Sequence, residues 1–171
     1  YLFLHILQDF LPVGSQIMFI QSLLEEKQVG SAMLVTGALN PYTSAHEAVA
    51  EMAMRHAIDT NHTHFYHGIG ASEMKPDAPL THAQKTRIVQ GSHRFLTKKL
   101  GSKLKTAVIP KASSVSPFHQ IAYLISKGHK KITVAVGSDQ LKEGGLRTHI
   151  EKHMKQHGGF LGMDNKPHQV E

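Results

Sequence analysis

The sequence predicts an α/β protein with a doubly wound parallel β-sheet between two layers of helices, a three-layer arrangement. From residue 31 onward, short β-rich apolar runs alternate with longer amphipathic segments, which is the order that βαβ units produce. The length of 171 residues fits one such domain with a short extension, and the apolar fraction of 40% is enough for a substantial core.

Four strands and the helices between them follow from this pattern. The predicted strands cover about 32–36, 64–69, 106–109 and 132–136, and the predicted helices cover about 44–58, 81–99 and 117–126. Thr81 is a good N-cap, and Pro117 suits the first position of a helix. The run from Ile132 to Val136 is continuously apolar, so we expect a central strand buried on both faces.

The two ends of the chain lie outside the alternation. Residues 1–30 are predicted to form an N-terminal helical extension, residues 31–160 the α/β domain, and residues 161–171 a polar tail. The apolar run from Tyr1 to Leu11 is shorter than the roughly 20 residues that span a bilayer, and no basic region precedes it. We therefore expect no membrane segment and a cytoplasmic location, with the apolar run packing on the domain, on a second copy or on an assembly partner.

Composition excludes several functional classes. Nineteen Lys and Arg against 13 Asp and Glu give a net charge of +6, which suits partners that carry phosphate. The absence of cysteine rules out a disulfide scaffold, a thiolate nucleophile and an iron–sulfur cluster. Aromatic residues make up 6% of the chain and tryptophan is absent, so nucleic-acid binding is not expected despite a basic cluster at 98–105.

Fourteen histidines are unusual for this length. His62 and His64 share a face of the second strand with His67 nearby, and His149, His153 and His157 recur every four residues. Metal binding is one interpretation of each group, but no carboxylate stands at a helpful spacing and lysines flank the second group. We predict no metal site in the protein.

The loop after the first strand carries the most chemical information. Ligands of doubly wound sheets bind outside the carboxyl ends of the strands, where the strand order reverses. Thr43 and His46 lie three residues apart at the start of the next helix, whose unpaired N–H groups attract phosphate. A capped helix with a buried histidine explains the same residues equally well.

The segment after the fourth strand is the second candidate. Gly137 ends the strand, and Ser138 and Asp139 follow it. Simple helix capping by Asp139 is one explanation. The other depends on position, because the segment would face the loop of Thr43 and His46 across the switch point.

Together these motifs resemble the nucleotidyltransferase superfamily marked by an (H/T)xGH motif, a Rossmann-like fold, and in particular its bacteriophage-encoded members. The family pattern G-x-(F/L)-(D/N)-P-x-(H/T)-x-G-H is matched by Gly37, Asn40, Pro41, Thr43 and His46. Ala45 stands where the family has glycine. The family element G-(S/A)-D-x-L matches 137–141, Pro79-Leu80-Thr81 followed by Lys85 also fits, and the likeness covers residues 32–141.

The resemblance implies transfer of a nucleoside monophosphate, from ATP with Mg²⁺, to a phosphorylated small-molecule acceptor with release of pyrophosphate. His46 would stabilise charge on the triphosphate with Thr43 as its partner, and Gly37 and Asn40 would line the same pocket. Lys75 and Lys85 would meet the pyrophosphate. Gly137, Ser138 and Asp139 would hold a ribose or the acceptor. The host cytoplasm is the location implied for a phage-encoded member.

A second interpretation is a catalytically degraded domain of this fold. The family's late element (I/M)S-(S/A)-T-x-x-(R/K) finds no match after Asp139, and Ala45 departs from the motif. Such a domain would have a structural or interaction role in a phage particle or a larger assembly.

Overall fold

A computed structural model describes residues 30–39, 41–76, 78–136, 144–161 and 167–168. Its central sheet consists of four parallel strands, β1 (Ala32–Gly37), β2 (His64–Ile69), β3 (Lys105–Val108) and β4 (Ile132–Ala135), in the order β3-β2-β1-β4. The chain moves outward from β1 to β3 and then returns to the other side of β1. The strand order therefore reverses between β1 and β4.

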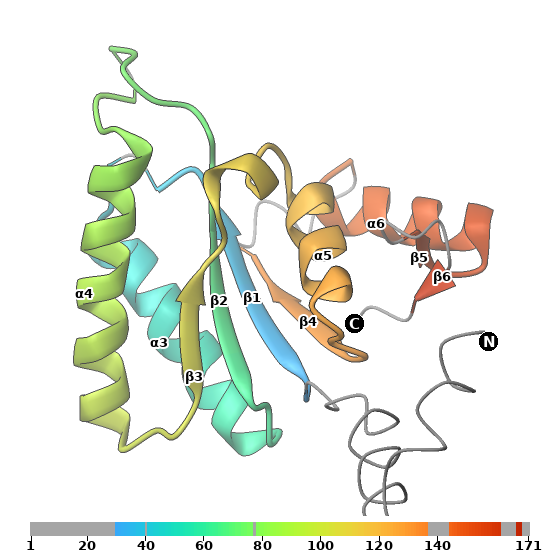
Figure 1. Ribbon diagram of the computed structural model, residues 1–171, viewed down its shortest axis with the longest axis horizontal. Coiled ribbons are helices and arrows are strands. Elements are labelled where there is room, and N and C mark those ends of the chain that lie inside the picture. The colour runs from blue at the N-terminus through green and yellow to red at the C-terminus, as the bar shows by residue number, and fades with distance from the viewer. Residues whose placement is uncertain (1–29, 40, 77, 137–143, 162–166, 169–171) are drawn as a thin grey trace, which may run out of the picture.

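Helices cover both faces of this sheet (Figure 1). The helices α3 (Ser44–Asp59) and α4 (His82–Leu100) lie on one face, and α5 (Pro117–Ser126) and α6 (Leu146–His157) lie on the other. A short 3₁₀ helix, η1 (Lys111–Ser113), precedes α5. The predicted α/β class is confirmed, and the arrangement is compatible with a Rossmann-like fold.

The core is divided by the sheet because successive side chains of a strand point to opposite faces. Ala32 and Leu34 of β1 pack with Ile121 of α5 in one buried cluster. Met33 and Val35 pack in a second cluster, which also contains Met54 of α3 and Leu96 of α4.

The helix starts follow the predicted capping residues. Thr81 Oγ1 accepts a hydrogen bond from the backbone N–H of Gln84 at 3.2 Å, and Ser116 Oγ accepts one from His119 at 3.4 Å. Pro117 is the first residue of α5, a position that needs no N–H donor.

The prediction that 132–136 forms a central strand is wrong. Among the described strands β4 pairs with β1 alone, so it is an edge strand, and Ile132 is its one fully buried residue. The apolar run led to a wrong prediction because apolar side chains indicate that helices cover the two faces of the sheet. They carry no information about whether a second strand lies alongside.

The ends of the chain differ in what the structure describes. The predicted helical extension lies outside the described residues, apart from Gly30, and stays a prediction. The two-residue strands β5 (Phe160–Leu161) and β6 (Pro167–His168) pair antiparallel, and β5 crosses the boundary placed between the domain and the tail. Within the described ranges, no helix has the length and apolar character needed to cross a membrane.

Candidate functional site

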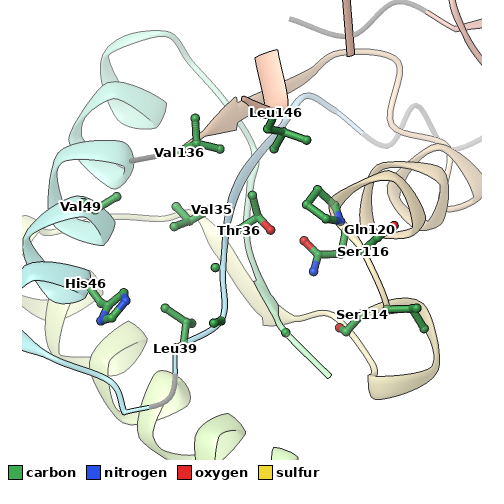
Figure 2. A pocket seen from close by; sticks show the side chains of 15 residues that line it. Val35, Thr36, Leu39, His46, Val49, Ser114, Ser116, Gln120, Val136 and Leu146 are labelled. Atoms are coloured by element: carbon green, nitrogen blue, oxygen red, sulfur yellow. The ribbon is translucent and has the colours of Figure 1, made fainter. Parts of the chain in front are cut away.

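A cavity of about 460 Å³ opens at the carboxyl edge of the sheet around the end of β1 (Figure 2). This volume falls in the range of small-molecule sites. The side of α3 contributes His46 and Val49, and the side of α5 contributes Ser116, Pro117 and Gln120. The remaining lining residues are Val35, Thr36, Gly37, Ala38, Leu39, Gly70, Ser114, Val115, Val136 and Leu146. The cavity therefore occupies the predicted place, the switch point of the sheet.

His46 is held at the start of α3 by Thr43. Its Nδ1 lies 3.1 Å from the backbone nitrogen of Thr43 and 2.8 Å from the hydroxyl of the same residue. Because a backbone N–H can only donate, Nδ1 is the acceptor, and the proton of the neutral imidazole is assigned to Nε2. The His46 ring, which lines the cavity, thus has Nε2–H as its available donor.

The loop after β1 takes an unusual path beneath His46. Leu39 has φ of 50°, a left-handed conformation that is strained for leucine, and its side chain is buried against Ile69 and Val89. The loop also lies close to the end of β2, since a Cβ on Gly70 would be 3.1 Å from Ala38 Cα. Burial of Leu39 and the absence of a side chain at Gly70 together fix this wall of the cavity.

Three helices begin at the cavity. Residues of the first turns of α3, α5 and α6 line it, namely His46, Pro117 and Leu146. In a parallel α/β fold each helix starts where the preceding strand ends, so the helix N-termini gather at one edge of the sheet. Their unpaired N–H groups create a positive potential, which favours an anionic ligand.

Lys85 lies away from the cavity. It is 0% exposed, and its ammonium donates to the carbonyl oxygens of Gly70 at 2.6 Å and Ser72 at 2.8 Å. Burial lowers the pKa of Lys85. The structure gives this residue a role in holding the loop after β2, because its ammonium donates to two backbone carbonyls of that loop and Lys85 is absent from the residues that line the cavity.

The same loop is held at a second point by Glu73. The carboxylate accepts a hydrogen bond from the backbone N–H of His82 at 2.7 Å and pairs with the ammonium of Lys111. Hydrogen bonds from these two groups lower the pKa of Glu73. The loop after β2 is thereby connected to the start of α4 and to η1.

The other predicted site residues fall into two groups. Thr43 and Lys75 are exposed, and neither lines the cavity, although Thr43 positions His46. Four predicted residues lie outside the described ranges: Asn40, Gly137, Ser138 and Asp139. The structure brings together two of the predicted residues, Gly37 and His46.

Sequence reasoning missed Gln120. Its side chain is 1% exposed, lines the cavity, and has a buried Oε1 without a hydrogen-bond partner. One signal could have indicated it, since Gln120 lies in the first turn of the helix that follows β3. A polar residue at that position points toward the carboxyl edge of the sheet.

A buried histidine pair connects β2 with α4. His67 Nδ1 and His93 Nε2 are 2.6 Å apart, and their rings stack with centroids 4.9 Å apart. Burial lowers the pKa of His93 to about 4 and the pKa of His67 well below its ordinary value. Both rings are therefore neutral at pH 7, and one donates its N–H to the other.

Two further histidines have local partners. His62 contacts the hydroxyls of Thr60 and Thr133, and His153 packs on the rings of Phe118 and Phe160. In the described part of the chain, no group of three or more histidines or carboxylates is arranged to hold a metal ion.

Comparisons with protein-family models, with curated proteins and with solved structures find no match to this chain.

Proposed function

We propose that the protein transfers an adenylyl group from ATP to a phosphorylated small-molecule acceptor. An oxygen of the acceptor attacks the α-phosphorus, a new P–O bond forms, and the bond to the bridging oxygen breaks to release pyrophosphate. The reaction needs no covalent intermediate, which suits a chain without cysteine. Mg²⁺ would enter as the ATP complex, bound through phosphate oxygens.

The observation that carries this proposal is the position of His46. Its ring lines the cavity, its Nδ1 is occupied by Thr43, and its Nε2–H is the donor left for a ligand. A donor fixed in advance stabilises charge that develops on phosphate oxygens in the transition state. The first turns of three helices around the cavity favour the same ligand charge.

The departure from the family motif at Ala45 is compatible with binding. Ala45 is exposed in the first turn of α3, and it is absent from the residues that line the cavity. Its methyl group therefore leaves the described cavity open. The proposal accordingly favours an enzyme over a purely structural domain of the same fold.

The direct test is pyrophosphate release from ATP and Mg²⁺ with candidate acceptors such as nicotinamide mononucleotide. We expect His46→Ala to lower the rate on the order of 100-fold, as removal of one fixed donor does at comparable sites. His119→Ala is a matched control, because His119 pairs with the N-cap Ser116 as His46 pairs with Thr43, but does not line the cavity. Equal rates for wild type and His46→Ala would reject the proposal.

A further inference from the structure

The half of the cavity beside α5 has a polar wall with an unsatisfied atom. Gln120 is 1% exposed and lines the cavity, yet its Oε1 has no hydrogen-bond partner. Native proteins pair nearly all of their buried polar side-chain atoms, because an unpaired one keeps the full cost of losing water. A ligand in the cavity that donates an N–H would supply the missing partner of this oxygen.

Gly68 makes room for this carboxamide. Thr36 of β1 and Gly68 of β2 are direct neighbours in the sheet, and Gln120 packs over Gly68 so closely that a Cβ there would overlap Oε1. Figure 2 shows the side chains of Thr36 and Gln120 turned toward each other, on the side of β1 opposite His46. Three elements thus build one compact polar subsite.

The subsite is uncharged. A carboxamide offers one acceptor oxygen and an NH₂ donor, and a threonine hydroxyl can donate or accept. His46 is the one titratable residue that lines the cavity in the described part of the chain, and it lies across β1. Among the described residues, a ligand carboxylate would find no cation on this side of β1 to replace its water, whereas a neutral N–H would satisfy Oε1.

The carboxamide can adjust to its ligand. The last side-chain torsion of glutamine is broad, so either end of the carboxamide can turn toward the cavity. Groups that match it carry a donor beside an acceptor in one plane. A primary carboxamide and the edge of a nucleobase share this chemistry.

We propose that Thr36 and Gln120 bind an uncharged, planar hydrogen-bonding group of the ligand. This inference deepens the proposed function and rests on it for the view that the phosphates lie on the His46 side of β1. The subsite then selects substrates by the neutral end of the molecule, while the helix N-termini bind the anionic end.

The test uses probes without phosphate, so that His46 contributes nothing to their binding. Adenosine, cytidine and nicotinamide are titrated into ¹⁵N-labelled protein, with nicotinate as the charged analogue of nicotinamide. The side-chain NH₂ signal of Gln120 is assigned from its loss in Gln120→Met. We expect at least one neutral probe to shift this signal and to bind at least tenfold more weakly to Gln120→Met. Nicotinate should bind both proteins equally weakly.

The choice of probe separates the two sources of this chemistry. A response to adenosine or cytidine assigns the subsite to a nucleobase, and a response to nicotinamide alone assigns it to the carboxamide of an acceptor. Gln90→Met, on the exposed surface of α4, is the matched control and should bind like wild type.

The variants also distinguish binding from a structural role. Methionine keeps the length of glutamine and removes the unpaired oxygen, so the melting temperature of Gln120→Met should not fall. Gly68→Ala would displace the carboxamide from the β2 side and should weaken binding of the same probe. This second variant tests the role of the carboxamide if Gln120→Met does not fold. The proposal is overturned if no neutral probe moves the Gln120 signal, or if the variants bind it as tightly as wild type.

Failure of this inference and failure of nucleotidyl transfer are separable. A neutral probe that binds at Gln120 in a protein that releases no pyrophosphate would reject the transfer reaction and keep the subsite. Pyrophosphate release that depends on His46, without any response at Gln120, would support the transfer reaction and reject the subsite.

Discussion

At the scale of single residues, the chemistry around the sheet depends on which nitrogen or oxygen already has a partner. His46 and His119 are both bound through Nδ1 to the N-cap residue of their helix, and His46 alone of the two lines the cavity. Gln120 is the opposite case, because its buried oxygen has no partner within the protein. Position and pairing, more than residue type, separate the side chains that line the cavity from similar side chains elsewhere.

The buried pair of His67 and His93 predicts a loss of stability in acid. Burial lowers the pKa of His93 from 6.5 to about 4, so the unfolded chain binds a proton at a higher pH than the folded one. Stability contributed by neutral His93 is complete above pH 6.5 and is lost as the pH falls toward 4, amounting to about 3 kcal/mol for this one group. Urea unfolding at a series of pH values measures this loss.

The comparison variants for that experiment are His93→Gln and His149→Gln. His93→Gln should flatten the dependence on pH between 6.5 and 4, leaving the part that His67 contributes. His149 is exposed on α6, so its replacement should leave the slope as in wild type. A slope that His93→Gln does not change would show that neutral His93 is not its source.

At the scale of elements, the loops at the carboxyl edge of the sheet are fixed by side chains from neighbouring helices. Lys85 of α4 binds two carbonyls of the loop after β2, and Glu73 of that loop binds the start of α4. Tyr42, in the loop after β1, contacts Ser92 of α4 through its hydroxyl at 3.0 Å. The helix α4 thus holds two of the loops that adjoin the cavity, those after β1 and β2.

Lys85→Met should therefore reduce stability even though methionine fills a similar volume. The substitution leaves the carbonyl oxygens of Gly70 and Ser72 without their charged donor, and we expect a loss of about 2 kcal/mol in the free energy of unfolding. Lys98→Met, on the exposed surface of the same helix, should change it by less than about 0.5 kcal/mol. Equal effects in a denaturant titration would contradict the structural role of Lys85.

At the scale of the whole molecule, the topology decides where the cavity lies. The order β3-β2-β1-β4 leaves a gap in helix coverage at the end of β1, because α3 and α6, the helices that follow β1 and β4 in the chain, lie on opposite faces of the sheet. Helices that begin at this gap add positive potential to a chain whose net charge is already +6.

Binding of ATP should consequently stabilise the whole domain. A ligand that binds the folded state alone adds about 2.7 kcal/mol at a concentration of one hundred times its Kd. Thermal unfolding with millimolar ATP and Mg²⁺ should raise the melting temperature of wild type by several degrees, and raise that of His46→Ala less. Sodium sulfate at equal ionic strength controls for a general salt effect, and an unchanged melting temperature with ATP would argue for a structural domain.

Much of the fold could be predicted because it follows from local patterns. A short β-rich run placed β2 at its observed bounds, and Pro117 and Thr81 marked helix starts that the structure confirms. The place of the cavity could also be predicted, because in parallel α/β folds the strand ends and helix starts coincide.

What the sequence by itself determined is the four parallel strands, the three helices between them and the position of His46 at the first turn of α3, since all of these depend on neighbours along the chain. Only the tertiary structure decided that β4 lies at the sheet edge, that Lys85 is buried against carbonyl oxygens and that Gln120 lies over Gly68. These features depend on contacts between residues distant in sequence. The physical reason is that the burial and hydrogen bonding of a side chain depend on which distant element packs against it. The residues next to it in the sequence do not specify that element.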